Sequence, residues 1–195
     1  MPKRKIIVMI ATSADGFIAR KDGAVDWLDR PNVAGDYGMG KFVKSIDTIV
    51  WGRKTYDMVV RFAKEGKPFP TMPGVKNYVF STKPRKKVLP GFEFVAEPIR
   101  KFADRLRAEK GKDIWMMGGA GIIGSFLDAG AIDEFVVHVI PTFIGEGIPL
   151  IAPRRRTVPL KLLSIKKFSD GVVGLHYEVS EARPSGRAAV RKAQS

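Results

Sequence analysis

The sequence contains no cysteine and only two histidines, His138 and His176. The absence of cysteine excludes disulfides, thiolate nucleophiles, iron–sulfur clusters and zinc sites built from thiolates. The two histidines lie far apart in the sequence and form no His-X-X-X-His pair, so no metal site is predicted. His138 falls in an aliphatic stretch and is expected to be a satisfied buried or interface histidine. His176 alternates with apolar residues and is expected to face solvent or a second subunit.

The sequence also lacks a run of about 18 apolar residues, the length that a membrane-spanning helix needs, so no membrane association is expected. The apolar run Ile6–Ala11 is followed by the polar segment Thr12–Gly16, which favours a buried strand over a signal peptide. A chain of 195 residues fits one domain. We therefore predict a cytoplasmic protein with a single folded domain over residues 1–180 and a basic, flexible tail over 181–195.

Positive charge is in large excess: 34 Lys and Arg against 20 Asp and Glu give a formal net charge of +14. Such an excess is typical of proteins that bind nucleic acids or other polyanions. No zinc-finger, RNA-recognition or helix-turn-helix pattern accompanies the charge. Nucleic-acid binding is therefore the less favoured alternative, and attraction of a small polyanion such as a phosphorylated cofactor is favoured.

Apolar, β-branched segments alternate with helical patterns along the chain. Strands are predicted over 5–12, 47–51, 77–81, 92–96, 113–117 and 132–141. Helices are predicted over 37–46, 53–62 and 98–110 and from Gly118–Gly121 to Asp128, and segment 13–31 is predicted to be a loop. The last two strands, 160–168 and 172–179, form a predicted hairpin around Asp170-Gly171. This order predicts an α/β fold whose sheet is parallel in its body and antiparallel at one edge.

Two predicted strand-to-helix turns carry the pattern of a phosphate site. The first is Gly52-Arg53-Lys54-Thr55, and the second is Gly118-Gly119-Ala120-Gly121-Ile122. Glycine lets the backbone approach a ligand closely, and the helix that follows offers free N–H groups to an anion. The guanidinium of Arg53 suits a phosphate monoester. Ser81-Thr82 follows the next strand and could reach the same anion. Each of these turns is also explained by packing alone, and only together do they favour ligand binding.

The motifs, taken in order, resemble those of the dihydrofolate reductase-like superfamily. They are Thr12–Ala19, Asp22-Gly23, Asp26–Leu28, Gly52–Tyr56, Val79–Ser81, Gly118-Gly119 and Pro141 with Gly145–Leu150. The sequence is most similar to the branch that includes the reductase domain of the riboflavin-biosynthesis deaminase–reductase. This resemblance implies a doubly wound three-layer sandwich, mostly parallel with a C-terminal antiparallel hairpin, that binds NADPH at the carboxyl ends of its strands. It also implies a homodimer.

The resemblance assigns roles to particular residues. Ala11 and Ile18 would flank the nicotinamide, and Ser81 and Thr82 would support the 2′-phosphate. Gly52, Arg53, Lys54 and Thr55 would hold phosphates. Gly118, Gly119, Ala120, Gly121 and Ile122 would contact the pyrophosphate. Met117 stands where riboflavin-pathway reductases usually carry an acidic residue, so the substrate stays open between a pteridine-like and a pyrimidine-like compound.

A reductase also needs a proton source and walls for its substrate. Three carboxylates in or beside the first long loop are candidates for the proton source, in the order Asp36, Asp26 and Asp15. Two of these carboxylates also have a structural interpretation: Asp36 could cap a helix, and Asp15 could be a turn residue. Trp27 and Phe42 could wall a flat substrate, or pack in the core. The sequence thus predicts an NADPH-dependent reductase; the alternatives are a nucleotide-binding module without catalysis and a basic nucleic-acid-binding protein.

Overall fold

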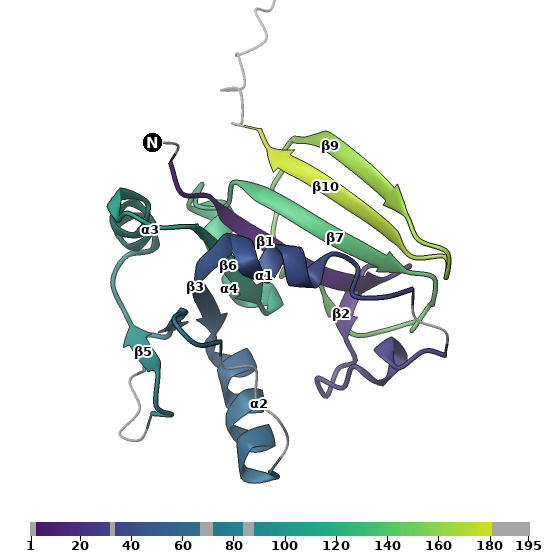
Figure 1. The fold of residues 1–195 in the computed structure, drawn as a ribbon, viewed down its shortest axis with the longest axis horizontal. Helices are drawn as coiled ribbons and strands as arrows, with labels where there is room; N and C mark the ends of the chain where they lie inside the picture. Colours follow the sequence, from purple (N-terminus) through teal and green to yellow (C-terminus); the bar gives the residue numbers. More distant parts are fainter. Residues whose placement is uncertain (1–2, 32–33, 67–71, 84–87, 181–195) are drawn as a thin grey trace, which may run out of the picture.

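The computed structural model describes residues 3–31, 34–66, 72–83 and 88–180, and its centre is one large β-sheet (Figure 1). The sheet has eight strands in the order β5-β4-β3-β6-β1-β7-β10-β9. These strands are β1 (Ile6–Ser13), β3 (Ile46–Gly52), β4 (Lys76–Phe80), β5 (Phe92–Val95), β6 (Asp113–Gly118), β7 (Glu134–Ile140), β9 (Leu160–Lys167) and β10 (Val173–Val179). The strands from β5 to β7 pair in parallel, and β10 pairs antiparallel with both β7 and β9. The predicted fold class is therefore confirmed.

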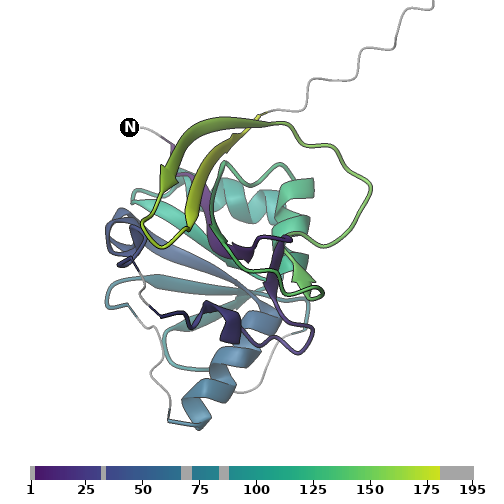
Figure 2. The same ribbon diagram turned by 90° about the vertical axis from the view of Figure 1, so that its right-hand side faces the viewer.

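Helices cover both faces of the parallel part, which gives three layers (Figures 1 and 2). They are α1 (Met39–Ser45), α2 (Arg53–Lys64), α3 (Ile99–Ala108) and α4 (Ala120–Asp128), with a short 3₁₀ helix at Asp26–Leu28. Figure 1 shows α1 in front of the central strands and α4 behind them. One buried cluster joins α3 and α4 to the sheet, and a second joins α1 and α2 to the opposite face. The hairpin β9–β10 extends the sheet beyond these helices.

Strand β1 shows why the central strands are apolar throughout. Its side chains alternate between the faces: Ile6 and Val8 pack in the cluster under α3 and α4, and Met9 packs in the cluster under α1 and α2. A strand that is covered on both faces has no solvent side for polar residues, so its sequence is a continuous hydrophobic run. The continuous run therefore identified the buried strand correctly.

The predicted elements agree with the observed ones, apart from small shifts at their ends and one segment. The segment 13–31, predicted to be a loop, contains β2 (Phe17–Ala19), which pairs antiparallel with β8 (Ile148–Pro149). These strands are too short for a period-2 pattern to be visible. Helix α1 begins at Met39 rather than at 37, because Tyr37 and Gly38 adopt positive φ angles of 51° and 88°. A positive φ is incompatible with a right-handed helix.

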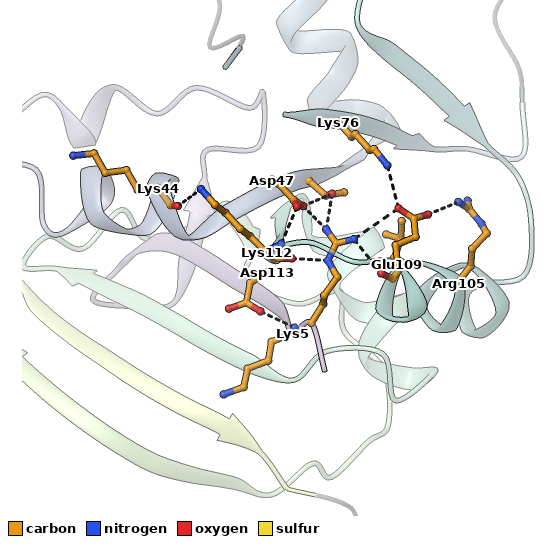
Figure 3. A network of polar contacts seen from close by, with 11 residues as sticks. Lys5, Lys44, Asp47, Lys76, Arg105, Glu109, Lys112 and Asp113 are labelled. Carbon is orange, nitrogen blue, oxygen red and sulfur yellow. Dashed lines mark hydrogen bonds and ion pairs between the residues drawn. The ribbon is translucent and has the colours of Figure 1, made fainter. Parts of the chain in front are cut away.

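A polar network fastens the amino-terminal ends of the strands, opposite the edge where the glycine turns lie (Figure 3). Arg4, which is 5% exposed, pairs with Asp47 and donates to Thr48 Oγ1 at 2.8 Å. Glu109, just after α3, lies 3.8 Å from Arg4 and 3.1 Å from Lys76 Nζ. A buried guanidinium is tolerated only when its donors are satisfied. Polar contacts therefore stabilise the amino-terminal ends of the strands, whereas apolar contacts join the helices to the faces of the sheet.

Among the described residues, no helix has the length and apolar character needed to span a membrane. The same residues contain no group of three or more His, Asp or Glu side chains placed to hold a metal ion. The predicted tail, 181–195, lies outside the described residues.

Candidate nucleotide and substrate site

The two glycine turns meet at the carboxyl ends of adjacent strands. Strands β3 and β6 pair in parallel, and Trp51 lies opposite Gly118 in their register. A Cβ atom added to Gly52 would lie 2.8 Å from Ile122 Cγ2 and 2.9 Å from the Gly118 carbonyl oxygen. No real Cβ is tolerated at such distances, so Gly52 is required by the close approach of the turns. The pairing of β3 and β6 thus makes the two turns neighbours in space.

The backbone conformation of the second turn requires glycine. Gly118 and Gly119 have φ angles of 110° and 76°, which other residues rarely adopt. The hydroxyl of Thr55 donates to the Gly118 carbonyl oxygen at 3.0 Å and joins the two turns. A Cβ on Gly121, in the first turn of α4, would meet nothing within 4 Å. The position of Gly121 is therefore open, and the N–H groups at the start of a helix, which have no partner within the helix, are the groups that bind phosphates.

Arg53 connects the first turn to the segment after β4. Its Nε lies 3.0 Å from Asp57, and its Nη1 donates to the Lys83 carbonyl oxygen at 3.0 Å and lies 3.5 Å from Ser81 Oγ. Lys54 and Thr82 are exposed at the same edge. The structure therefore brings together the predicted phosphate residues of β3, β4 and β6. Whether they bind a cofactor stays a prediction.

A cavity of about 210 Å³ lies at the middle of β1 and the carboxyl-terminal half of β7. One of its lining residues, Ile10, comes within 3.5 Å of the position of a Cβ on Gly118, in the second turn. It is lined by Met9, Ile10, Ala11, Leu28, Arg30, Asp36, Tyr37, Met39, His138 and Ile140. Ala11, a predicted nicotinamide neighbour, lies in this wall, whereas Ile18 lies in β2 and is not among the lining residues. Most of the wall is apolar, and its polar members are Arg30, Asp36, Tyr37 and His138. A cavity of this kind suits a small planar molecule with a few polar atoms.

The three carboxylates predicted as proton donors are not brought together, and each makes structural contacts. Asp36 accepts the N–H groups of Gly38 and Gly40, both at 2.8 Å, and these bonds lower its pKa. Asp26 binds Arg20 at 2.6 and 2.8 Å, and this hydrogen bond lowers the pKa of Asp26.

Asp15 has a similar role in a different loop. It accepts the Ser13 hydroxyl at 2.5 Å and the Gly145 N–H at 2.7 Å, and these bonds lower its pKa. Carboxyl groups with lowered pKa values are ionised at neutral pH and are poor proton donors. Of the three, only Asp36 lines the cavity, where its carboxylate is an acceptor. The geometry therefore argues against the proton-donor role that the sequence suggested.

Trp27 and Phe42, the two aromatic residues predicted to contact a flat substrate, also lie outside the cavity lining. Trp27 is 6% exposed and packs with Ile140, Phe168 and Val172, while Phe42 meets Trp115 edge-to-face at 5.4 Å. Neither is among the lining residues of the cavity. Their alternative interpretation as packing residues is the one that the geometry supports.

Apart from Asp36, sequence reasoning missed the residues that form the polar side of the cavity. The Tyr37 hydroxyl donates to the Asp170 carboxylate, which also pairs with Arg30. His138, expected only to be buried or at an interface, is 8% exposed and lines the cavity beside Tyr37. Asp170 lies 133 residues after Tyr37, so no local pattern signals their contact. The Asp170-Gly171 turn was recognised as a hairpin, but not as part of the site.

His176 has a partner within the chain: its Nε2 lies 2.8 Å from Glu134 Oε2 on the neighbouring strand, while its side chain remains 34% exposed. It is therefore part of the sheet's own polar network and not of the cavity.

Comparison with known proteins shows which family and which structures this chain is similar to. The family described as RibD C-terminal domain matches residues 4–174. "Uncharacterized protein YwjB" of Bacillus subtilis (strain 168) is 39% identical over 175 residues, which cover 90% of this chain and 98% of YwjB. The crystal structure of a "Putative riboflavin biosynthesis protein" from Shewanella sp. PV-4 has a TM-score of 0.76 and 29% identity over 90% of this chain and 99% of that one.

More distant structures share the fold. A diaminohydroxyphosphoribosylaminopyrimidine deaminase/5-amino-6-(5-phosphoribosylamino)uracil reductase from Thermotoga maritima has a TM-score of 0.67 and 16% identity, over 91% of this chain and 57% of that one. Dihydrofolate reductase from Enterococcus faecalis, complexed with NADP(H), has a TM-score of 0.60 and 15% identity, over 91% and 97%. The fold is thus that of the dihydrofolate reductase-like proteins.

Proposed function

The chain belongs to the RibD C-terminal domain family, and we propose that it is an NADPH-dependent reductase of a small planar heteroaromatic compound, pteridine-like or pyrimidine-like. One observation carries the proposal: the glycine turns at the ends of β3 and β6 meet, and Ile10, which reaches Gly118, belongs with Ala11 to the wall of a largely apolar cavity. Two structural relatives give independent support. One is named as a uracil-derivative reductase, and the other was solved with NADP(H).

The residues present fit a nicotinamide dinucleotide. Gly52 and Gly119 let the two turns approach each other closely, and Gly121 leaves open space in the first turn of α4. Arg53 stands at the edge where a 2′-phosphate would distinguish NADPH from NADH, next to Ser81. When bound, this cofactor supplies the hydride. The chain itself orients the two rings, excludes water from the cavity and holds the substrate's polar atoms.

The test is to replace Arg53 with Ala and to titrate the protein with NADPH and NADH, following the quenching of tryptophan fluorescence. Loss of a charge-assisted hydrogen bond to phosphate should weaken NADPH binding about tenfold to a hundredfold and change NADH binding little. Arg61→Ala, an exposed position in the last turn of α2, is the matched control and should change neither. Equal losses for both cofactors would contradict the role of Arg53, and absence of binding by the unaltered protein would contradict the function.

A second candidate is a nucleotide-binding module without catalysis, favoured by the three carboxylates that are committed to structural contacts. It predicts micromolar cofactor binding with no oxidation of NADPH in the presence of pteridines or pyrimidines. Oxidation of NADPH that depends on any such compound would eliminate it.

A further inference from the structure

His138 occupies the deep side of the cavity, one strand from Ala11. In the register of the sheet it lies between Ala11 of β1 and Gly174 of β10. A Cβ on Gly174 would lie 3.4 Å from both Nε2 and Cδ2 of His138, so glycine leaves the imidazole room over β10. The side chain is nine-tenths buried, and yet it lines the cavity. It is thus a buried polar group placed against the space that a substrate would fill.

The imidazole is held in its neutral form. Burial lowers the pKa of His138, hydrogen bonding to the Tyr37 backbone raises it, and the charge of Lys166 on β9 lowers it further, so that the net shift is downward. A hydrogen bond that raises the pKa of an imidazole is one in which a ring N–H donates. In a neutral imidazole the other nitrogen is then an acceptor. His138 therefore offers an unprotonated nitrogen.

Tyr37 is held in a strained conformation at this point. It is the non-glycine residue of the described chain with a positive φ, 51°. The conformation is fixed from several sides: its hydroxyl donates to Asp170, Arg30 Nη2 donates to that hydroxyl at 3.1 Å, and its ring meets Phe168 edge-to-face at 5.0 Å. Backbone strain that surrounding contacts maintain is concentrated at functional sites. The ring of Tyr37 lies beside the imidazole of His138, with 5.9 Å between the ring centroids.

We propose that His138 is a specificity residue that accepts a hydrogen bond from a ring N–H of a planar lactam heterocycle bound in the cavity. The apolar side chains of Met9, Met39 and Ile140 pack against the faces of the ring, and the Asp36 carboxylate accepts from a second donor. This inference rests on the proposed function in taking the cavity as the substrate site.

The experiment compares two planar probes, lumazine, which has ring N–H donors, and 1,3-dimethyllumazine, which has none. Their dissociation constants are measured by calorimetry with the full-length protein and with His138→Phe. The unaltered protein should bind lumazine about five- to tenfold more tightly than the dimethyl compound, and His138→Phe should lose that preference. A preference due only to the bulk of the methyl groups would persist in His138→Phe and would overturn the proposal.

Because the chain contains only two histidines, a second readout is possible that leaves His138 in place. In protein labelled with [¹⁵N]histidine, only His138 and His176 give imidazole signals, and His176→Gln assigns them. Lumazine should shift the His138 ring nitrogens and leave those of His176 unchanged, and His176→Gln should keep the affinity for lumazine. Unchanged His138 signals, or no binding of lumazine up to its solubility limit, would overturn the proposal. NADPH titration of the same sample tests the proposed function separately, so the two failures are distinguishable.

Discussion

Glu134 is the buried carboxylate of β7, and its side chain is only 7% exposed. It accepts a hydrogen bond from Lys5 Nζ at 2.5 Å and lies 2.8 Å from His176 Nε2. Burial raises the pKa of Glu134, but the hydrogen bonds from Lys5 and His176 outweigh burial and lower it below its usual value. The ionised form of this carboxylate is therefore the form that the folded sheet requires.

Replacement of Glu134 with Gln should remove part of the pH dependence of stability. A carboxylate whose folded pKa is lowered stabilises the fold above its unfolded pKa, and this stabilisation is lost as the pH falls through the folded value. Glu134→Gln should lower the free energy of unfolding by about 1–3 kcal/mol at pH 7. Urea unfolding between pH 7 and pH 3 should show a shallower acid decline for the variant.

The matched control for this prediction is Glu178→Gln. Glu178 lies opposite Glu134 in the β7–β10 register, but its side chain is 49% exposed and only 3.6 Å from Lys161 Nζ. Exposed pairs of this kind contribute little, so the change should stay below about 0.5 kcal/mol. If Glu134→Gln gave a pH profile parallel to that of the unaltered protein, the ionised Glu134 carboxylate would have no role in stability.

At the scale of elements, α4 provides a case in which stability and binding should move in opposite directions. A Cβ on Gly121 meets no protein atom within 4 Å, so Gly121→Ala creates no clash. Alanine is the better helix former by about 0.5–1 kcal/mol, and the variant should be more stable by up to that amount in urea unfolding. The added methyl group should nevertheless weaken NADPH binding, because it stands where the phosphates would approach the helix.

Gly124→Ala in the same helix is the control for the cofactor effect. Its Cβ would meet Arg156 Nη2 at 3.4 Å and Ile151 Cγ2 at 3.5 Å, distances close to ordinary contact and on a side away from the turn. NADPH affinity should therefore be unchanged in Gly124→Ala. Equal NADPH affinity in Gly121→Ala and the unaltered protein would show that the phosphates do not approach α4 here.

The elements also show how far sequence reasoning reaches. The central strands and the strand-to-helix glycine turns were predictable, because burial on both faces and glycine before a helix leave local patterns. The β2–β8 pair was not, because strands of three and two residues carry no period. The cavity was not predictable either, because Tyr37, His138 and Asp170 meet only through the sheet order. Such contacts are set by tertiary structure and not by spacing.

At the scale of the whole molecule, the free edge of the sheet exposes large apolar side chains alternating with lysines. Strand β9 ends the strand order, and all of its residues are exposed. Leu160 and Leu162 are each 47% exposed, and Ile165 is 62% exposed. Natural proteins protect edge strands, because unpaired backbone groups next to apolar side chains recruit further strands. We propose that a second copy of this chain covers β9, in keeping with the homodimer that the family resemblance implies.

Sedimentation equilibrium tests this proposal. The unaltered protein should sediment as a dimer, and Ile165→Lys should shift it to a monomer, because a charge placed in the interface cannot be desolvated without a partner. Phe143→Ser is the control: Phe143 is 79% exposed, but it lies in the loop after β7 and not on β9, so this variant should stay dimeric. A monomeric unaltered protein, or a dimer that tolerates Ile165→Lys, would show that β9 is not the interface. Retention of NADPH binding by monomeric Ile165→Lys would further show that one protomer supplies the complete cofactor site.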